Sequence, residues 1–218
     1  MKEIIEIMES DLSDTAKEAY NSLRANIQFY SKSKKIKTLA ITSFNKGEGK
    51  TTTSINLAIS MAKIGMNVLY IDADLRKTSL LKNSNEYNLG LSNILLSQIT
   101  MEDAVNRTNI RSLNYITSGG LTLYAGELIS SNKFSQFLQE VKVQYDLIII
   151  DTPPLGKVID GVVIAAQTDG TVIVIASNTT KTHHTAMMKE QLSKANANIV
   201  GVVLNKIPKE SYKYYYGK

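Results

Sequence analysis

Residues 47–52 place two glycines beside a lysine and two threonines, a combination that suits phosphate. The segment reads Gly47-Glu48-Gly49-Lys50-Thr51-Thr52. Glycines let backbone N–H groups turn inward around phosphate oxygens, and the N-terminus of a following helix adds a positive dipole end. In such a loop Lys50 reaches the β- and γ-phosphates, and the Thr51 hydroxyl binds Mg²⁺. The segment therefore predicts a P-loop, the phosphate-binding loop of nucleotide-binding proteins.

The motif is incomplete at its first position. The usual pattern, G-x-x-x-x-G-K-[ST], requires glycine at position 44, where this chain has Phe44. On this segment alone, a loop and helix that bind no ligand remain an alternative. Two acidic segments further along the chain favour the nucleotide.

Two carboxylates, Asp72 and Asp74, follow the apolar segment 67–71. That segment predicts a buried strand, and open α/β sheets bind ligands at the carboxyl ends of their strands. Carboxylates this close repel each other unless a cation lies beside them, and Mg²⁺ prefers oxygen ligands. A polar turn capped by Asp74 is the alternative, but Arg76 two residues later favours phosphate binding.

A third carboxylate, Asp151, follows four consecutive aliphatic residues at 147–150 and precedes two prolines. This is the Walker B pattern, a buried parallel strand with an acid at its end. Asp151 would hold Mg²⁺ or its water. Capping of the next loop is the alternative, although a third acid at a strand end is hard to attribute to capping alone.

Hydrophobic periodicity indicates the elements that position these residues. Strands are expected at 36–41, 67–71, 113–117, 147–150, 171–176 and 199–205, and helices at 15–30, 55–64, 91–96, 101–105, 131–143 and 182–194. Strands alternating with helices predict an α/β fold of the P-loop NTPase type, with a mostly parallel central sheet and helices on both faces.

Neighbouring residues in the sequence indicate the role of two further candidate sites, Asn205 and the pair His183-His184. A guanine-reading N-K-x-D motif beginning at Asn205 would need Asp at 208, where this chain has Pro208, so adenine is expected near Asn205. His183 and His184 begin a predicted helix without other clustered ligands, and they are expected at the surface.

The composition fits one α/β domain. The chain has 218 residues, 43% of them hydrophobic, a formal net charge of +5 and no cysteine. No apolar run approaches the ~20 residues of a membrane span, and acids near the start argue against a secretory signal. The lack of cysteine excludes a disulfide framework and fits a cytoplasmic chain. No DNA-reading motif accompanies the positive charge, so no nucleic-acid partner is expected.

The chain ends in a tyrosine-rich segment that a buried core does not explain. Tyr212, Tyr214, Tyr215 and Tyr216 lie within it. The alternatives are nonspecific association of a low-complexity segment and base stacking on nucleic acid. We interpret these tyrosines as substrates.

Taken together, these segments resemble the bacterial tyrosine kinases (BY-kinases), in particular the CpsD/CapB-like cytoplasmic subunits of capsule and exopolysaccharide loci. The resemblance covers nearly the whole chain and is carried by the P-loop at 47–51, the Walker A′ segment 69–76, the Walker B segment 148–154 and the tyrosine-rich end. In the related MinD/ParA ATPases a signature lysine lies five residues before the P-loop lysine. That position is Asn45 here, which favours the kinase branch.

The chain also departs from the family pattern. Lys46 stands where the family often has proline, and residues 123–125 replace a Pro-rich stretch. An oligomerisation motif E-x-x-R-x-x-R is similar to the segment that begins at Glu18, where Asn21 replaces the first arginine and Arg24 matches the second. The ring-shaped oligomer of the family is therefore expected in a weakened form.

The resemblance implies an ATP-dependent protein-tyrosine kinase that uses Mg²⁺ and phosphorylates its own tail in trans. It also implies a cytoplasmic protein recruited to the inner face of the membrane by an adaptor of the chain-length-determinant type, opposed by a cognate tyrosine phosphatase and forming a homo-oligomer. The domain organisation expected is a leader at 1–14, a kinase domain at 15–207 that includes an N-terminal helix, and a flexible tyrosine-rich tail at 208–218.

The resemblance also assigns roles to residues. Catalysis is assigned to Lys50, Asp72, Asp74 and Asp151; nucleotide binding to Gly47, Glu48, Gly49, Lys50, Thr51, Thr52, Arg76 and Asn205; and Mg²⁺ to Thr51, Asp74 and Asp151. Asp72 would orient the tyrosine hydroxyl, and an exchange of roles between Asp72 and Asp74 remains open. Two rival functions are a MinD/ParA-like ATPase that switches a membrane or DNA partner and a nucleotide-binding adaptor with negligible turnover.

Overall fold

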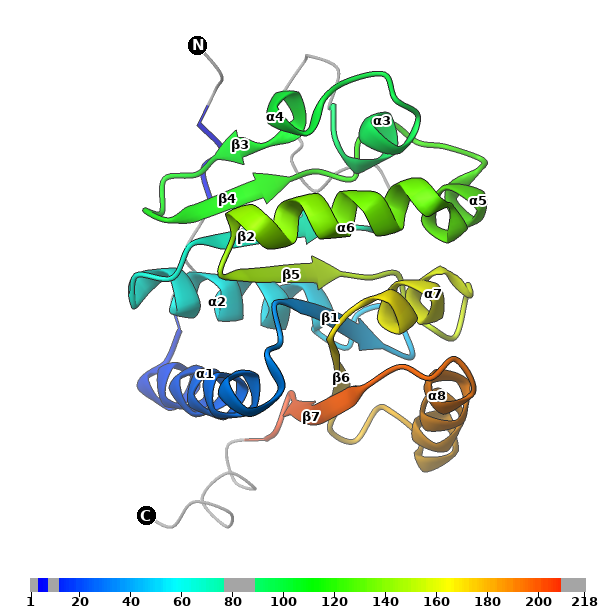
Figure 1. Ribbon diagram of the computed structural model, residues 1–218. Helices are drawn as coiled ribbons and strands as arrows, with labels where there is room; N and C mark the ends of the chain where they lie inside the picture. The colour runs from blue at the N-terminus through cyan, green and yellow to red at the C-terminus, as the bar shows by residue number, and fades with distance from the viewer. Residues whose placement is uncertain (1–3, 8–11, 77–88, 209–218) are drawn as a thin grey trace.

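One sheet organises the part of the chain that the computed structural model describes, residues 4–7, 12–76 and 89–208 (Figure 1). Within these residues the sheet has seven strands in the order β3-β4-β2-β5-β1-β6-β7. The strands are β1 Thr38–Ser43, β2 Val68–Asp72, β3 Asn106–Arg107, β4 Leu113–Ile116, β5 Leu147–Asp151, β6 Gly170–Ala176 and β7 Ile199–Asn205. All neighbouring strands pair in parallel except β3 and β4. The predicted mostly parallel sheet is confirmed.

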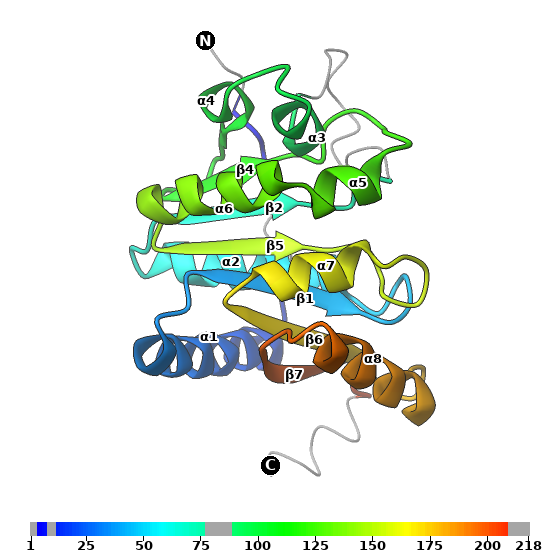
Figure 2. The same cartoon turned by 45° about the vertical axis from the view of Figure 1, so that its right-hand side comes forward.

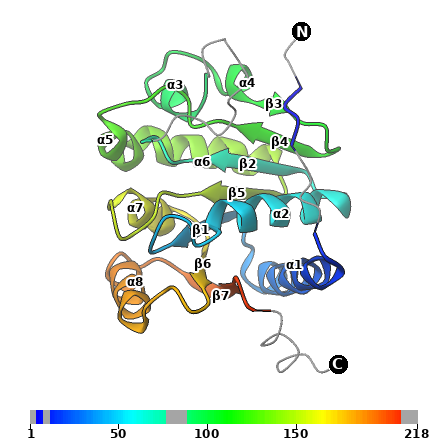
Figure 3. The same cartoon turned by 180° about the vertical axis from the view of Figure 1, so that it is seen from behind.

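Helices cover both faces of this sheet, as predicted (Figures 2 and 3). They are α1 Asp14–Lys34, α2 Lys50–Lys63, α3 Leu91–Leu95, α4 Met101–Ala104, α5 Ala125–Ser130, α6 Asn132–Gln144, α7 Asp160–Gln167 and α8 Thr182–Lys194. Helices α1 and α2 pack on one face, and α5, α6, α7 and α8 lie on the other. Because both faces are buried, a central strand reads as a continuous apolar run. In β5, Ile148 and Ile150 enter one core and Leu147 and Ile149 enter the other.

Most of the predicted helices have different bounds in the structure, and two of the differences are informative. Helix α1 extends four residues beyond the predicted end at 30, to Lys34. It ends where Lys35 adopts a left-handed conformation with φ of 55°. The helix expected at 131–143 is preceded by a separate helix, α5, because Ser131 is extended with ψ of 156°.

Helix α7 was not predicted. Its sequence, DGVVIAAQ, contains glycine and three β-branched residues. These residue types have low helix propensity, so the local sequence looks more like a strand. Packing against the sheet and α5 overrides that preference.

The described part of the N-terminal leader pairs with the sheet edge beyond β3. The Ile5 backbone N–H donates to Arg107 O at 2.9 Å, and the Asn109 N–H donates to Ile5 O at 3.3 Å. Residues 4–7 were expected to be irregular, but Ile5 pairs through its backbone with residues 107–109 and extends that edge of the sheet. On the face of the sheet that α1 and α2 cover, Arg24 of α1 donates to Ser60 Oγ of α2 at 2.9 Å. The arginine that the resemblance links to oligomer contacts thus bonds within its own chain.

Asp169 ties the start of β1 to the end of α6. Its carboxylate accepts hydrogen bonds from the backbone N–H groups of Lys37 and Thr38 at 2.9 and 2.8 Å, and from Lys142 Nζ at 2.7 Å. Partial burial alone would raise the pKa of Asp169, but the hydrogen bonds from Lys142, Lys37 and Thr38 together lower it below its usual value.

Replacing Asp169 with asparagine is expected to lower stability near neutral pH by about 1 to 2 kcal/mol, because a charged acceptor of three hydrogen bonds is lost. A pKa lower in the folded than in the unfolded state stabilises the protein above the unfolded value of about 3.9, and the stabilisation is lost as pH falls through the folded value. Thermal unfolding of wild type, D169N and E140Q, an exposed control on α6, checks this. If D169N were destabilised relative to wild type as much at pH 3 as at pH 7, the assigned role of the Asp169 charge would be contradicted.

Candidate active site

The loop between β1 and α2 has the backbone shape of a phosphate cradle. Gly47 and Gly49 have φ of 85° and 95°, in the left-handed region that side chains disfavour. A Cβ added at Gly49 would overlap the amide of Asn205 at the end of β7. Asn205 Nδ2 donates to Glu48 O at 3.0 Å, and Lys206 Nζ donates to Gly47 O at 2.6 Å. The last residue of β7 and the residue after it therefore support the loop.

Glu48 braces the same loop through its side chain. Only 2% exposed, it accepts hydrogen bonds from the Asn45 backbone N–H at 3.0 Å, from Asn45 Nδ2 at 3.0 Å and from Thr180 Oγ1 at 2.6 Å. The Glu48 carboxylate is thus engaged inside the protein, and only its backbone is left to contact a nucleotide. Sequence reasoning placed Glu48 among the nucleotide ligands and missed this bracing role, because Thr180 lies far away in the chain.

The predicted acids meet at the carboxyl ends of β2 and β5. Asp151 Oδ1 lies 2.8 Å from Lys50 Nζ, and Asp151 Oδ2 accepts from Thr51 Oγ1 at 2.6 Å. Asp72 is the register partner of Asp151 on the neighbouring strand, and its Oδ1 accepts from the Asp74 backbone N–H at 3.1 Å. The three acids are at most 3% exposed and Lys50 is 7% exposed. The fold therefore gathers Lys50, Thr51, Asp72 and Asp151 at one place, and Asp74 follows Asp72 by two residues.

The buried carboxylates affect the pKa of two nearby tyrosines, Tyr70 and Tyr115. Burial, and then the charges of Asp151 and Asp72, raise the pKa of Tyr70 and Tyr115. Both tyrosines stay protonated at any physiological pH. Their rings stack with centroids 5.2 Å apart.

The donor set fits Mg²⁺ on chemical grounds. A hydroxyl and carboxylates are the oxygen ligands this ion prefers, and proteins usually hold it through one or two carboxylates together with substrate phosphates. Within the described residues, no group of three or more acids, histidines or cysteines could hold a metal by itself. Thr51, Asp74 and Asp151 are the residues that would hold it.

Arg76, predicted to contact phosphate, is engaged by another acid. Its Nε and Nη2 donate to the two oxygens of Asp160 at 2.8 and 3.1 Å, at the first turn of α7. The Asp160 partnership, and then the charges of Asp74 and Glu127, raise the pKa of Arg76. The arginine thus fastens the segment after β2 to α7. Thr52, also predicted as a nucleotide ligand, lies exposed in the first turn of α2.

Comparison with known proteins decides the family. The AAA domain family matches residues 36–205. The chain is 38% identical to the tyrosine-protein kinase YwqD of Bacillus subtilis over 92% of its own length and 86% of that protein. It is 36% identical to the putative tyrosine-protein kinase CapB of Staphylococcus aureus over 94% of its own length and 91% of that protein. The chain belongs to the BY-kinase family.

Solved structures agree with this assignment. The BY-kinase chain superposes on the chimerical protein CapA2B2 with a TM-score of 0.84 and 33% identity, covering 92% of this chain and 88% of the other. The cell-division ATPase MinD of Pyrococcus furiosus gives a TM-score of 0.65 at 23% identity, covering 82% of this chain and 78% of the other. The MinD likeness shows a shared fold alone. The comparisons thus favour a protein-tyrosine kinase over the MinD-like alternative.

A ring stack at the start of the P-loop was missed by sequence reasoning. Phe44 stacks on His184 with centroids 4.1 Å apart, and a Cβ on Gly156 would come within 2.9 Å of the Phe44 ring. The backbone N–H of Gly156 donates to Phe44 O at 2.9 Å. Phe44 thus fastens the loop after the Walker B strand to α8. His183 is exposed, as expected for both histidines, whereas His184 is partly buried in this stack.

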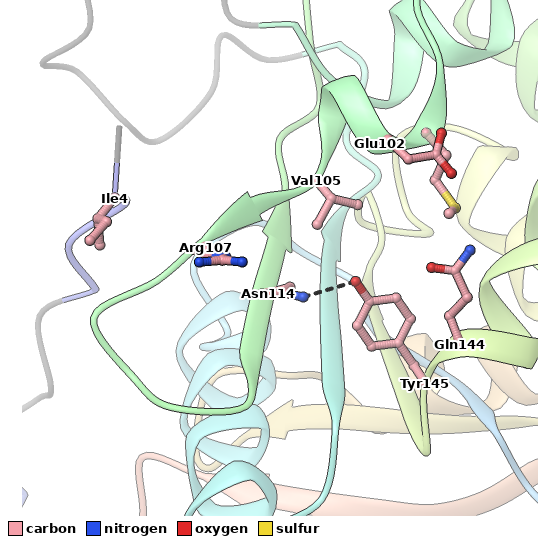
Figure 4. A pocket seen from close by; sticks show the side chains of 8 residues that line it. Ile4, Glu102, Val105, Arg107, Asn114, Gln144 and Tyr145 are labelled. Atoms are coloured by element: carbon pink, nitrogen blue, oxygen red, sulfur yellow. Dashed lines mark hydrogen bonds between the residues drawn. The ribbon is translucent and has the colours of Figure 1, made fainter. Parts of the chain in front are cut away.

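One cavity among the described residues of this BY-kinase lies away from these residues (Figure 4). Its volume is about 540 Å³, and it is lined by Ile4, Met101, Glu102, Val105, Arg107, Asn114, Gln144 and Tyr145. Asn114 Nδ2 donates to Tyr145 Oη at 2.9 Å across its floor. None of its lining residues was predicted to bind nucleotide. The predicted phosphorylation sites, Tyr212, Tyr214, Tyr215 and Tyr216, lie outside the described residues.

Proposed function

We propose that this chain transfers the γ-phosphoryl group of ATP to tyrosines in the C-terminal segment of another copy. The observation that supports this best is the contact of Lys50 and Thr51 with Asp151, beside Asp72 and Asp74, in a member of the BY-kinase family. Phosphoryl transfer has a loose transition state, so positioning and charge neutralisation supply most of the catalysis. A buried ammonium beside a row of backbone amides supplies both.

Each residue then has a role. Lys50 would exchange Asp151 for the β- and γ-phosphate oxygens when ATP binds. Magnesium, held by Thr51, Asp74 and Asp151, would supply further positive charge at those oxygens. Asp72 would accept a hydrogen bond from the acceptor tyrosine, whose hydroxyl has a pKa near ~10 and needs help to lose its proton. Adenine would lie near Asn205.

The wider setting is proposed from the family resemblance. None of the helices in the described residues has the length and apolar character to cross a membrane. We propose recruitment to the inner face of the membrane by the cytoplasmic end of a chain-length-determinant adaptor, regulation of capsule or exopolysaccharide synthesis, and reversal by a cognate phosphatase. The CpsD and CapB names of the relatives support this setting.

Incubation with γ-labelled ATP, Mg²⁺ and the adaptor's cytoplasmic segment tests the proposal. We expect label on the protein, and we expect the Y212F/Y214F/Y215F/Y216F variant to lose at least nine tenths of it, because these tyrosines carry the acceptor hydroxyls. Release of free phosphate with unlabelled protein would support an ATPase instead, and no turnover would support a nucleotide-binding adaptor. Label on an inactive K50M copy mixed with wild type would show transfer between copies.

A further inference from the structure

Exposed apolar side chains gather at the loops that lead into α5 and α7. Leu121, Leu123 and Tyr124 are 62%, 93% and 64% exposed, and Ile159 is 62% exposed. We call these four residues the apolar rim. Three of them fall within four consecutive residues, in the region where the chain departs from the Pro-rich pattern of its family. Apolar side chains this exposed and this close in sequence are typical of a surface that binds something.

The apolar rim is fixed to the candidate active site. A Cβ built on Gly126, two residues after Tyr124, would lie 3.6 Å from Asp160 Oδ1 and 3.7 Å from Arg76 Nη2. The start of α5 therefore packs against the Arg76–Asp160 ion pair, which fastens the segment after β2 to the start of α7. Ile159 directly precedes Asp160. Arg76 in turn follows Asp74 by two residues. The loops into α5 and α7 lie at the same edge of the sheet as the P-loop (Figure 2).

The segment before the apolar rim is held by hydrogen bonds. The Leu91 backbone N–H donates to Thr117 O at 2.9 Å, and Ser92 Oγ donates to Gly120 O at 3.0 Å. The Leu128 N–H donates to Tyr124 O at 2.9 Å where α5 begins. The rim residues are thus presented from an anchored loop, which lowers the entropy lost when a partner binds.

We propose that the apolar rim is the docking surface for the tyrosine-rich segment 209–218 of a second copy, and that it delivers one tyrosine to the acids. The inference rests on the proposed function. A tyrosine ring suits an apolar platform because its body is apolar and only its hydroxyl needs a polar partner. The segment holds three lysines, at 209, 213 and 218, against one acid, Glu210. Those lysines complement the exposed carboxylate of Glu127, which lies near Arg76.

The length of the segment also permits this. It follows β7, which lies four strands from β2 in the sheet, a separation of roughly 19 Å at ~4.8 Å per strand. Ten residues reach at most about 35 Å. A segment of this length is therefore long enough to span the distance between β7 and an active site, and it can also reach a copy whose active site lies within about 35 Å.

A peptide of residues 208–218 tests the docking surface directly. The enzyme is the variant whose four tail tyrosines are phenylalanine, so that the peptide is the acceptor under study. Comparison of this enzyme with and without L121S/L123S should show the KM for the peptide raised about tenfold, with kcat and nucleotide affinity unchanged, because two leucine contacts are lost. V143S removes a side chain that is 85% exposed at the end of α6 and should change nothing.

Fluorescence anisotropy of the labelled peptide with the Mg–ADP enzyme gives a second reading that needs no catalysis. Weaker binding to L121S/L123S than to V143S supports the rim. Equal KM and equal anisotropy in these two variants would overturn the docking proposal while leaving the kinase function intact. Failure of every enzyme to label the peptide would instead overturn the proposed function. The anisotropy measurement would still show whether the peptide binds at the apolar rim. Loss of self-association by L121S/L123S with unchanged peptide binding would show that a folded surface of a second copy is the occupant, which also overturns the proposal.

Discussion

Replacing Lys50 with methionine is expected to reduce phosphate transfer at least about a hundredfold, the effect typical of removing one preorganised charge at a reacting oxygen. Lys50 is 7% exposed and its Nζ lies 2.8 Å from Asp151, so its charge acts in a site from which water is largely excluded. Methionine keeps most of the side-chain volume and removes only the ammonium. Initial rates of label incorporation, with nucleotide affinity measured in parallel, check this.

The control for this substitution lies on the same helix. Lys63 is exposed at the end of α2, and K63M removes a charge of the same kind far from the acids. Because K50M leaves Asp151 with less compensation, a thermal unfolding curve should accompany the rates. A folded K50M protein that keeps more than half of the wild-type rate would contradict the assigned role.

Replacing Gly49 with alanine is expected to abolish nucleotide binding within the measurable range, a loss of at least about a hundredfold in affinity. Two costs act together. The φ of 95° disfavours any side chain by roughly 1–2 kcal/mol, and the added Cβ would overlap the Asn205 amide. Relieving that overlap means moving Asn205 away from Glu48 O, which releases the brace behind the P-loop. Calorimetric titration with Mg–ADP measures the affinity.

Two other glycines separate these costs. Gly47 has φ of 85° but open space around a Cβ, so G47A should show only the conformational cost, about a tenfold loss. Gly201 in β7 has open space and no positive φ, and G201A should bind normally. Nucleotide affinity of G49A equal to that of G47A would show that the Asn205 contact is unimportant.

The parts of the site that could be predicted are those with local signals. The glycine-lysine-threonine loop is contiguous, and Asp72 and Asp151 each end an apolar strand. Parallel strands bring such ends to one edge, so their meeting followed from pattern alone. The strand order has no local signal, yet it makes Asp72 and Asp151 direct neighbours.

The rest depends on contacts between residues distant in the chain. The local sequence around Arg76 does not indicate its contact with Asp160, which lies 84 residues later. The same holds for Glu48, whose partner Thr180 is 132 residues away. Asp160 belongs to α7, which was not predicted because its sequence is rich in β-branched residues. Thr180 belongs to a loop that carries no recognisable motif.

Mass spectrometry of the protein before and after incubation with Mg–ATP tests the central claim most directly. If Lys50, Thr51 and the three acids form one phosphoryl-transfer site, wild type will gain successive phosphates that map to residues 212–218, and K50M incubated alone will gain none. Phosphate gained equally by K50M, or located only outside that segment, would contradict it.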